Sequence, residues 1–104
     1  MSKEVIHYNL LEEILAHPGL LRFYPPDRLR DELIFQGYEI KPLSRGHYKG
    51  IDFEEGGGYK INYAGNGILA YHPTDRSHHH GAYYKISDGE KGTRRYDLKG
   101  KEIT

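Results

Sequence analysis

The stretch YKINYAGNGILAYH, residues 59–72, decides the fold. In its first part, Tyr59, Ile61 and Tyr63 alternate with polar residues, which is the period of a strand that buries one face. The run Gly65-Asn66-Gly67 follows, and it is a strong signal for a tight hairpin turn. The residues after this turn return as a second strand, so the stretch predicts an antiparallel β-hairpin.

Two more strands are predicted after this hairpin. Ala82, Tyr84 and Ile86 alternate with residues suited to the opposite face. Residues 88–92 have the Asp and Gly content of a second hairpin loop, and residues 93–98 then form the last strand. Together the strands predict an antiparallel meander.

Two helices are predicted before the strands. Ser2 is a suitable N-cap for a helix that runs to Ala16, along which apolar residues recur at four-residue spacing. His17-Pro18-Gly19 ends that helix. Pro25-Pro26-Asp27 begins a second helix, because Pro is favoured in the first turn and Asp interacts well with the positive helix end. Gly37 is its predicted C-terminal cap.

The order of these elements predicts the fold class. Short alternating segments at 38–41 and 51–54 indicate brief strands between the helices and the hairpin. Helices first and a meander next make an α+β fold, with two N-terminal helices packed on an antiparallel sheet of four to five strands. A length of 104 residues supports one domain over 1–104, with a helical part at 1–37 and a sheet part at 38–104 that carries the site.

Such a sheet packs one face on the helices and turns the other face to solvent. Alternation assigns to the helix-facing side Tyr59, Ile61, Tyr84, Ile86, Tyr96 and Leu98. It assigns to the outward side Lys60, Asn62, Lys85, Ser87, Thr93, Arg95 and Asp97. The outward face therefore combines three cations with hydroxyl and amide groups.

The charge of the chain is zero in total but is distributed unevenly. Fifteen Lys and Arg balance fifteen Asp and Glu, while residues 1–55 carry a charge of −3 and residues 56–104 carry +3. The second part also holds most of the Tyr, His and Gly. An acidic helical part and a basic, aromatic strand part suggest a supporting and a working element, which leaves an RNA partner open. Ordinary scatter of charge is the plainer interpretation.

Two features exclude whole classes of function. The chain has no Cys, which excludes disulfides, thiolate metal sites and a thiolate nucleophile. It has no run of about 18 apolar residues, so a membrane partner is not expected.

Four His lie within nine residues, as His72 and the run His78-His79-His80. Histidine exchanges protons near neutral pH, so this loop can supply the acid and base that RNA cleavage requires. The loop could also bind a metal or be a solvated connection without a role, and no spacing resembles a structural zinc site. Asp52 and Glu54 with a His could form a magnesium-dependent nuclease, although further acidic partners are not evident.

The segments that hold these residues resemble a known family. They read GGGYKINY at 56–63, YHP at 71–73, SHHHGAYYKIS at 77–87 and GTRRYDL at 92–98. In this order they resemble the C-terminal nuclease domains of bacterial polymorphic toxins, including contact-dependent growth inhibition effectors. These domains are ribonucleases, often tRNases, of the barnase–EndoU–colicin–RelE fold. The resemblance covers about residues 37–104.

The resemblance implies an endoribonuclease that cleaves RNA, often tRNA, by metal-independent transesterification, without a cofactor and leaving 2′,3′-cyclic phosphate. The family has a His pair where this chain has three His, so His78 and His79 both remain candidates for the acid/base. Lys85 and Arg95 match positions that bind the scissile phosphate. The full catalytic set is His78, His79, Lys85, Ser87, Thr93 and Arg95, in which the two hydroxyls hydrogen-bond the phosphate oxygens. The substrate-binding set is Lys60, Asn62 and Tyr83.

The resemblance also implies partners and a location. A cognate immunity protein would plug the active site, so the chain is expected as a monomer or as a heterodimer with that protein. The domain would be delivered as part of a secreted bacterial effector and would act in the target-cell cytoplasm. The alternative is a non-catalytic RNA-binding or immunity-like interaction protein, which needs the basic face but not the His loop.

Overall fold

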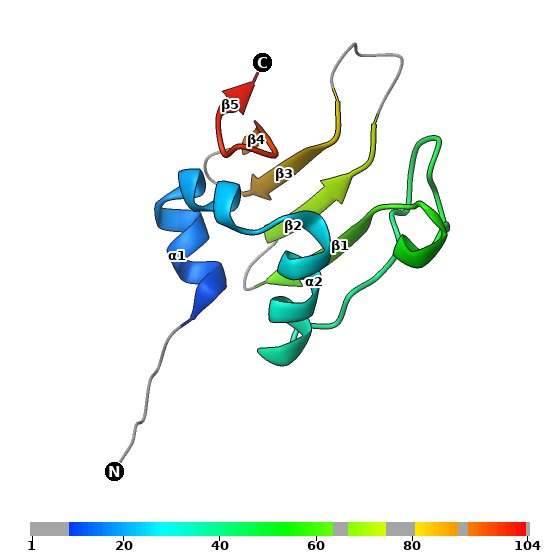
Figure 1. The fold of residues 1–104 in the computed structure, drawn as a ribbon, viewed down its shortest axis with the longest axis horizontal. Helices are drawn as coiled ribbons and strands as arrows, with labels where there is room; N and C mark the ends of the chain where they lie inside the picture. Colours follow the sequence, from blue (N-terminus) through cyan, green and yellow to red (C-terminus); the bar gives the residue numbers. More distant parts are fainter. Residues whose placement is uncertain (1–8, 64–66, 75–80, 90–91, 104) are drawn as a thin grey trace.

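Helical elements come first along the chain, and a five-stranded sheet follows (Figure 1). The computed structural model describes residues 9–63, 67–74, 81–89 and 92–103. The helical elements are α1 (Leu10–Ala16), the 3₁₀-helix η1 (Pro18–Phe23), α2 (Pro26–Phe35) and the 3₁₀-helix η2 (Phe53–Glu55). The strands are β1 (Tyr59–Tyr63), β2 (Gly67–His72), β3 (Tyr83–Asp88), β4 (Gly92–Asp97) and β5 (Glu102–Ile103).

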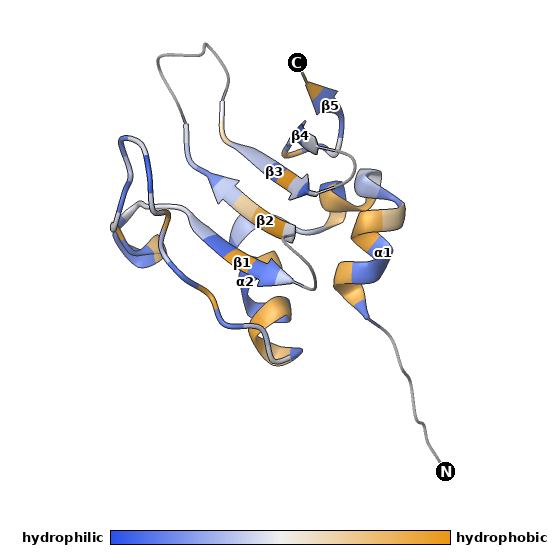
Figure 2. Cartoon of the chain, turned by 180° about the vertical axis from the view of Figure 1, so that it is seen from behind, coloured by the Kyte–Doolittle hydropathy of each residue, from blue (hydrophilic) through white to orange (hydrophobic). Residues whose placement is uncertain are grey.

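The sheet is an antiparallel meander in which each strand pairs with the next, in the order β1-β2-β3-β4-β5. The helices α1, η1 and α2 cover one face of the sheet, and the view from behind shows the opposite face free of helices (Figure 2). The predicted α+β class, with N-terminal helices on an antiparallel meander, is therefore confirmed. No helix in the described part of the chain is long and apolar enough to cross a membrane.

The helices differ from the predicted ones mainly at their ends. α1 begins at Leu10, and the side chain of its N-cap Asn9 accepts a hydrogen bond from the Glu12 amide at 3.2 Å. The predicted start at Ser2 is therefore wrong for this helix, and Ser2 itself lies outside the described residues. α2 begins at the predicted Pro-Pro-Asp run and ends before Gly37, whose φ of 96° suits a glycine after a helix.

The core lies between the helices and the sheet. Leu10, Ile14 and Leu29 are fully buried against the apolar side of the sheet. The buried phenols of Tyr59 and Tyr84 donate hydrogen bonds of 2.6 Å to the carbonyls of Pro26 and Tyr24, respectively. Burial raises the pKa of both phenols far above the usual value, so they stay protonated and act as donors. These bonds join the edge strand β1 to the start of α2 and the central strand β3 to the end of η1.

Three predicted details of the sheet are wrong. Residues 51–54 form no strand, because the amides of Glu55 and Gly57 donate to the Asp52 carbonyl and turn the chain into η2. Residues 38–41 contribute only an isolated bridge between Lys41 and Lys60. Leu98 follows the end of β4 and is 36% exposed, so it is not part of the helix-facing set. The other five predicted helix-facing residues are buried.

Candidate functional site

The strand residues predicted for the site lie in three rows on the face of the sheet away from the helices, which is called the open face. Figure 2 views the sheet from this side. Each row runs across the strands, because residues paired in an antiparallel ladder point to the same side. The neutral row consists of Asn62, Ile68, Ser87 and Thr93. The cationic row consists of Lys60, Ala70, Lys85 and Arg95. The imidazole row consists of His72, Tyr83 and Asp97.

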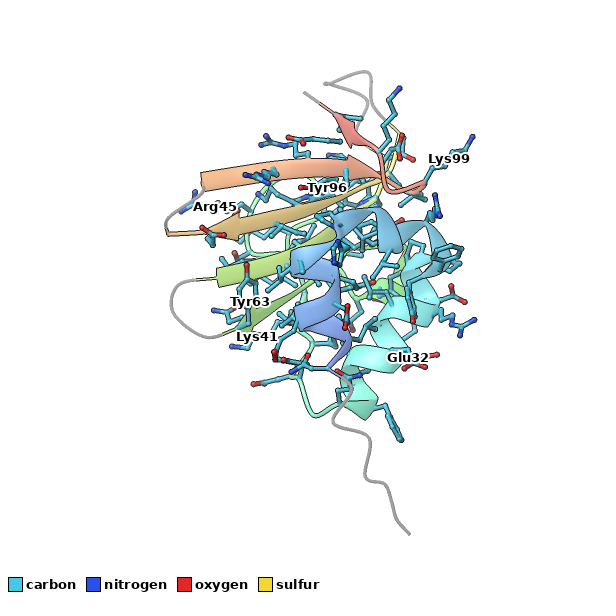
Figure 3. All side chains as sticks on the ribbon, turned by 90° about the vertical axis from the view of Figure 1, so that its left-hand side faces the viewer. Glu32, Lys41, Arg45, Tyr63, Tyr96 and Lys99 are labelled. Atoms are coloured by element: carbon cyan, nitrogen blue, oxygen red, sulfur yellow. The ribbon has the colours of Figure 1, made fainter. Side chains whose placement is uncertain are left out.

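A segment without regular structure, the 42–50 loop, overhangs the β1 side of this face. The Lys60 ammonium donates to the Ser44 hydroxyl at 3.0 Å, and the Tyr48 hydroxyl donates to the Thr74 carbonyl at 3.0 Å. A groove of about 360 Å³ results, lined by the loop residues Leu43, Ser44 and Arg45 and by the sheet residues Lys60, Ile68, Ala70, His72, Lys85 and Ser87. Figure 3 shows Arg45 on the opposite side of the molecule from Glu32 of α2.

The glycine run at 56–58 allows the loop to approach the sheet. A Cβ on Gly58 would meet the Tyr71 carbonyl and would lie 2.7 Å from Leu43 Cδ1. A Cβ on Gly57 would likewise meet the backbone carbonyl of Ile51. The run therefore has a packing role at the groove.

Positive charge is concentrated around Lys85. Burial of its ammonium lowers the Lys85 pKa below the usual value, and the neighbouring charges of Arg95, Arg45 and Lys60 lower it further. These four residues are the cation cluster. Arg30 pairs with Asp31 and Glu54, and within the described ranges no ion pair joins a carboxylate to a member of the cation cluster. A bound anion would relieve this repulsion, so the cluster is suited to a phosphate.

The hydroxyls of the neutral row bond to each other across β3 and β4. Ser87 Oγ and Thr93 Oγ1 are 3.0 Å apart, and either atom can be the donor. Both hydroxyls lie one row away from Lys85 and Arg95. The structure thus brings Lys60, Asn62, Lys85, Ser87, Thr93 and Arg95 to one face, and their functional roles remain predictions.

Tyr83 and His72 form a stacked pair at the other end of the face. Their ring centroids are 4.9 Å apart with an interplanar angle of 6°. Tyr83 is only 8% exposed, so little of its ring is accessible to a nucleotide base. Its stacking contact with His72 orients the imidazole. His72 lies in the groove but was not among the predicted site residues. Alternation along β2, which places Ile68 and Ala70 on the same face, is the signal that could have identified it.

Two other groove residues, Ser44 and Arg45, have no comparable signal in the sequence. They belong to an irregular loop that reaches the face through tertiary contacts rather than through a strand period. Arg45 is nevertheless one of the charges that act on Lys85. Sequence reasoning therefore missed a cation that only the folded chain brings to the site.

The two His predicted as acid/base, His78 and His79, lie outside the described residues. The described residues before and after them are Thr74 and Gly81, which lie next to the strand ends that carry His72 and Tyr83. Within the described ranges, no group of three or more His, Asp or Glu could hold a metal ion. Glu54, from the magnesium alternative, pairs with Arg30 at 3.2 Å, away from the groove.

Comparison of the chain with models of protein families, with characterised proteins and with solved structures gives no significant match. The function of the chain is therefore inferred from the geometry of the groove. Its main elements are the cation cluster, the neighbouring imidazole and the hydroxyl pair.

Proposed function

We propose that this chain is a toxin ribonuclease that cleaves RNA, with tRNA as the expected substrate, by metal-independent acid/base transesterification. The observation that carries the proposal is the cation cluster around Lys85, which no described carboxylate neutralises, in a groove that also contains an imidazole. A cluster kept without counter-ions is unfavourable for the free protein and favourable for a bound phosphodiester. Supporting structure alone gives no reason to retain it.

The reaction assigns a task to each part of the groove. A base removes the proton of the ribose 2′-OH, the 2′-oxygen attacks phosphorus, and the bond to the 5′-oxygen breaks as an acid protonates that oxygen. His78 or His79 is the proposed acid/base, and His72 is a third candidate already in the groove. Lys85 and Arg95 stabilise the negative charge that develops on the phosphorus oxygens. The product carries a 2′,3′-cyclic phosphate.

The first experiment incubates the purified chain with total RNA, with and without EDTA, and maps the ends of the fragments. We expect fragments with 2′,3′-cyclic phosphate in both samples. Arg95→Gln should lower the cleavage rate about 100-fold, the order of effect seen when one group that stabilises transition-state charge is removed. Arg94→Gln is the matched control, because Arg94 pairs with the core residue Ile86 and points to the other face. Its rate should stay within about twofold of the wild type.

Other results would exclude the proposal. Loss of cleavage in EDTA would indicate a metal-dependent nuclease. RNA binding without cleavage would indicate the non-catalytic alternative, an RNA-binding or interaction protein. Equal effects of the Arg94 and Arg95 variants on the cleavage rate would show that the groove is not the site of cleavage.

A second experiment tests the imidazoles. Single Ala variants of His72, His78 and His79 and the combined His78→Ala/His79→Ala variant are compared for activity and for thermal unfolding. We expect the combined variant to lose activity and to keep its melting temperature. Full activity in that variant, with loss in His72→Ala, would assign the acid/base role to His72 instead.

The proposal includes a biological setting. The chain would reach the target-cell cytoplasm as part of a secreted effector, and a cognate immunity protein would cover the groove. Expression of the wild type in bacteria should arrest growth and produce RNA fragments. Arg95→Gln should relieve the arrest, whereas Arg94→Gln should not.

A further inference from the structure

The three rows of the open face are too far apart to act on one phosphate oxygen. A strand rises about 3.3 Å per residue, so the neutral row lies about 6.6 Å from the cationic row and about 13 Å from the imidazole row. Lys85 and Arg95 have long side chains that can lean along the strands. Ser87 and Thr93 have short ones, and a hydrogen bond adds only about 2.8 Å of reach. The hydroxyls therefore contact a different part of an RNA from the part next to His72.

The neutral row also presents acceptors that a phosphate cannot use. One of the two hydroxyls donates to the other, which leaves a single O–H donor and several lone pairs facing outward. Asn62 adds an amide with both donors and an acceptor. A phosphate oxygen only accepts hydrogen bonds, whereas a ribose hydroxyl or a base edge both donates and accepts. The row thus fits a neutral nucleoside group beside a phosphate held by the cation cluster.

The position of the base along the open face sets the polarity of the bound RNA. His72 lies at the end with the imidazole row, and the chain that carries His78 and His79 leaves and rejoins the described part there, after Thr74 and before Gly81. The base acts on the 2′-OH of the nucleoside on one side of the phosphate. We assign the base to the imidazole row, which places the attacking nucleoside toward that row and the nucleoside of the leaving 5′-oxygen toward the neutral row.

We propose that the neutral row is the subsite for the leaving nucleoside, which Ser87 and Thr93 recognise through its 2′-hydroxyl or its base edge. The inference rests on the proposed ribonuclease function. It gives these two residues a role in specificity in place of the predicted contact with the oxygens of the scissile phosphate.

The test compares two substrates that share the attacking nucleoside. One is a dinucleotide, and the other is the nucleoside 3′-(4-nitrophenyl phosphate), which lacks a leaving nucleoside. Ser87→Ala/Thr93→Val should lower kcat/KM for the dinucleotide about tenfold, and at least fivefold more than for the aryl ester. Ser87→Thr/Thr93→Ser, which keeps both hydroxyls, is the matched control and should stay within about threefold on both substrates. Thermal unfolding confirms that each variant is folded.

Substitutions in the substrate distinguish the two groups that the row could read. If the row reads the ribose, the wild type should have a lower kcat/KM for a dinucleotide with a 2′-deoxy leaving nucleoside than for the ribose form. In Ser87→Ala/Thr93→Val, the hydroxyl-free variant, this difference between the two substrates should disappear. If the row reads the base edge, the wild type should differ in kcat/KM between dinucleotides with different leaving bases, and the hydroxyl-free variant should lose that difference. Equal loss on the dinucleotide and the aryl ester would overturn the inference, as would no loss on either.

A binding measurement separates failure of the inference from failure of the proposed function. The probes are a dinucleotide with a 2′-deoxy attacking nucleoside and the matching 2′-deoxynucleoside 3′-phosphate, neither of which can be cleaved. The hydroxyl-free variant should bind the dinucleotide at least threefold more weakly and the mononucleotide equally well. If the wild type cleaves nothing but this difference is seen, the reaction is wrong and the subsite stands. Equal weakening for both probes would reject the subsite.

Discussion

At Lys85, the charge that suits phosphate binding opposes the stability of the fold. Its ammonium is half-buried in the middle of the sheet, and the three other members of the cation cluster act on it. Burial and like charges each disfavour the charged form, and among the described residues no carboxylate compensates. A residue chosen for stability at this place would be apolar.

We therefore expect Lys85→Met to lower RNA cleavage about 100-fold and to stabilise the fold at pH 7. The lowered folded-state pKa means that the unfolded chain binds more protons between the folded and unfolded pKa values, so wild-type stability rises with pH there. The gain in the free energy of unfolding from Lys85→Met should be greatest below the folded-state pKa of Lys85. It should vanish as the pH approaches the pKa of Lys in the unfolded chain, near 10.4. Solvent screening keeps it on the order of 0.5 kcal/mol.

Thermal unfolding of both proteins at pH 7 and pH 10 measures this prediction. A gain of 0.5 kcal/mol corresponds to about 2–4 °C for a domain of this size. A lower melting temperature of the Met variant at pH 7 would show that Lys85 is stabilised by its surroundings.

The same lowered pKa predicts how RNA affinity depends on pH. As pH rises through its folded-state pKa, Lys85 loses the charge that attracts a phosphate, so affinity should fall at a lower pH than for an ordinary Lys. Arg keeps its charge throughout this range, so Lys85→Arg should move the decrease to higher pH. Fluorescence anisotropy with a 2′-O-methyl oligonucleotide, which lacks the nucleophilic hydroxyl, measures this decrease. Coinciding profiles would mean that Lys85 does not contact phosphate.

Some site residues are accessible to sequence reasoning and some are not. Lys60, Lys85 and Arg95 follow from strand alternation, and the register confirms that they share a face. His72 follows from the same rule applied to β2. Arg45 does not, because its position depends on tertiary bonds such as that between Lys60 and Ser44 rather than on a repeating period.

At the scale of elements, the regular alternation of 59–72 and 82–98 predicted the meander because paired strands satisfy their own backbone and bury one face. Residues 51–54 alternate equally well but fold into η2. Local amide bonds to Asp52 and the positive φ of Gly56 turn the chain there, and four residues of alternation are too few to oppose them. The start of α1 was misjudged because Ser2 and Asn9 are both good caps, and only packing chooses between them.

The packing of the 42–50 loop on the sheet gives a prediction for Gly58. Gly58→Ala would press a methyl group against the Tyr71 carbonyl of β2 and against Leu43, so one of the two must move. We expect a loss of about 1–3 kcal/mol in the free energy of unfolding and a weakened RNA affinity, because the loop carries Arg45. Gly19→Ala is the control, since a Cβ there meets nothing within 4 Å.

Urea unfolding and oligonucleotide binding test the two parts of this prediction separately. If Gly58→Ala loses stability and keeps its RNA affinity, the loop would be structural only. Equal behaviour of the Gly58 and Gly19 variants would contradict the close approach itself.

For the whole molecule, the zero net charge conceals the surface that matters. The helical part is acidic and the strand part is basic. The fold places the cation cluster on the open face, because strand pairing and the 42–50 loop bring its members together there. Binding of a polyanion depends on the local charge of that face rather than on the total. The neutral sum therefore does not argue against an RNA partner.

The salt dependence of RNA affinity tests the open face as the binding surface quantitatively. Each phosphate neutralised on single-stranded RNA contributes about −0.7 to the slope of log K against log salt, so four cations predict a slope of about −3. Removing one member, as in Arg45→Met, should reduce the magnitude of the slope by about 0.7. Lys99→Met is the matched control, because Figure 3 shows Lys99 on the side away from Arg45. A neutral protein that binds RNA through scattered charges would show a shallow slope and equal effects of both variants, and that result would reject the open face as the binding surface.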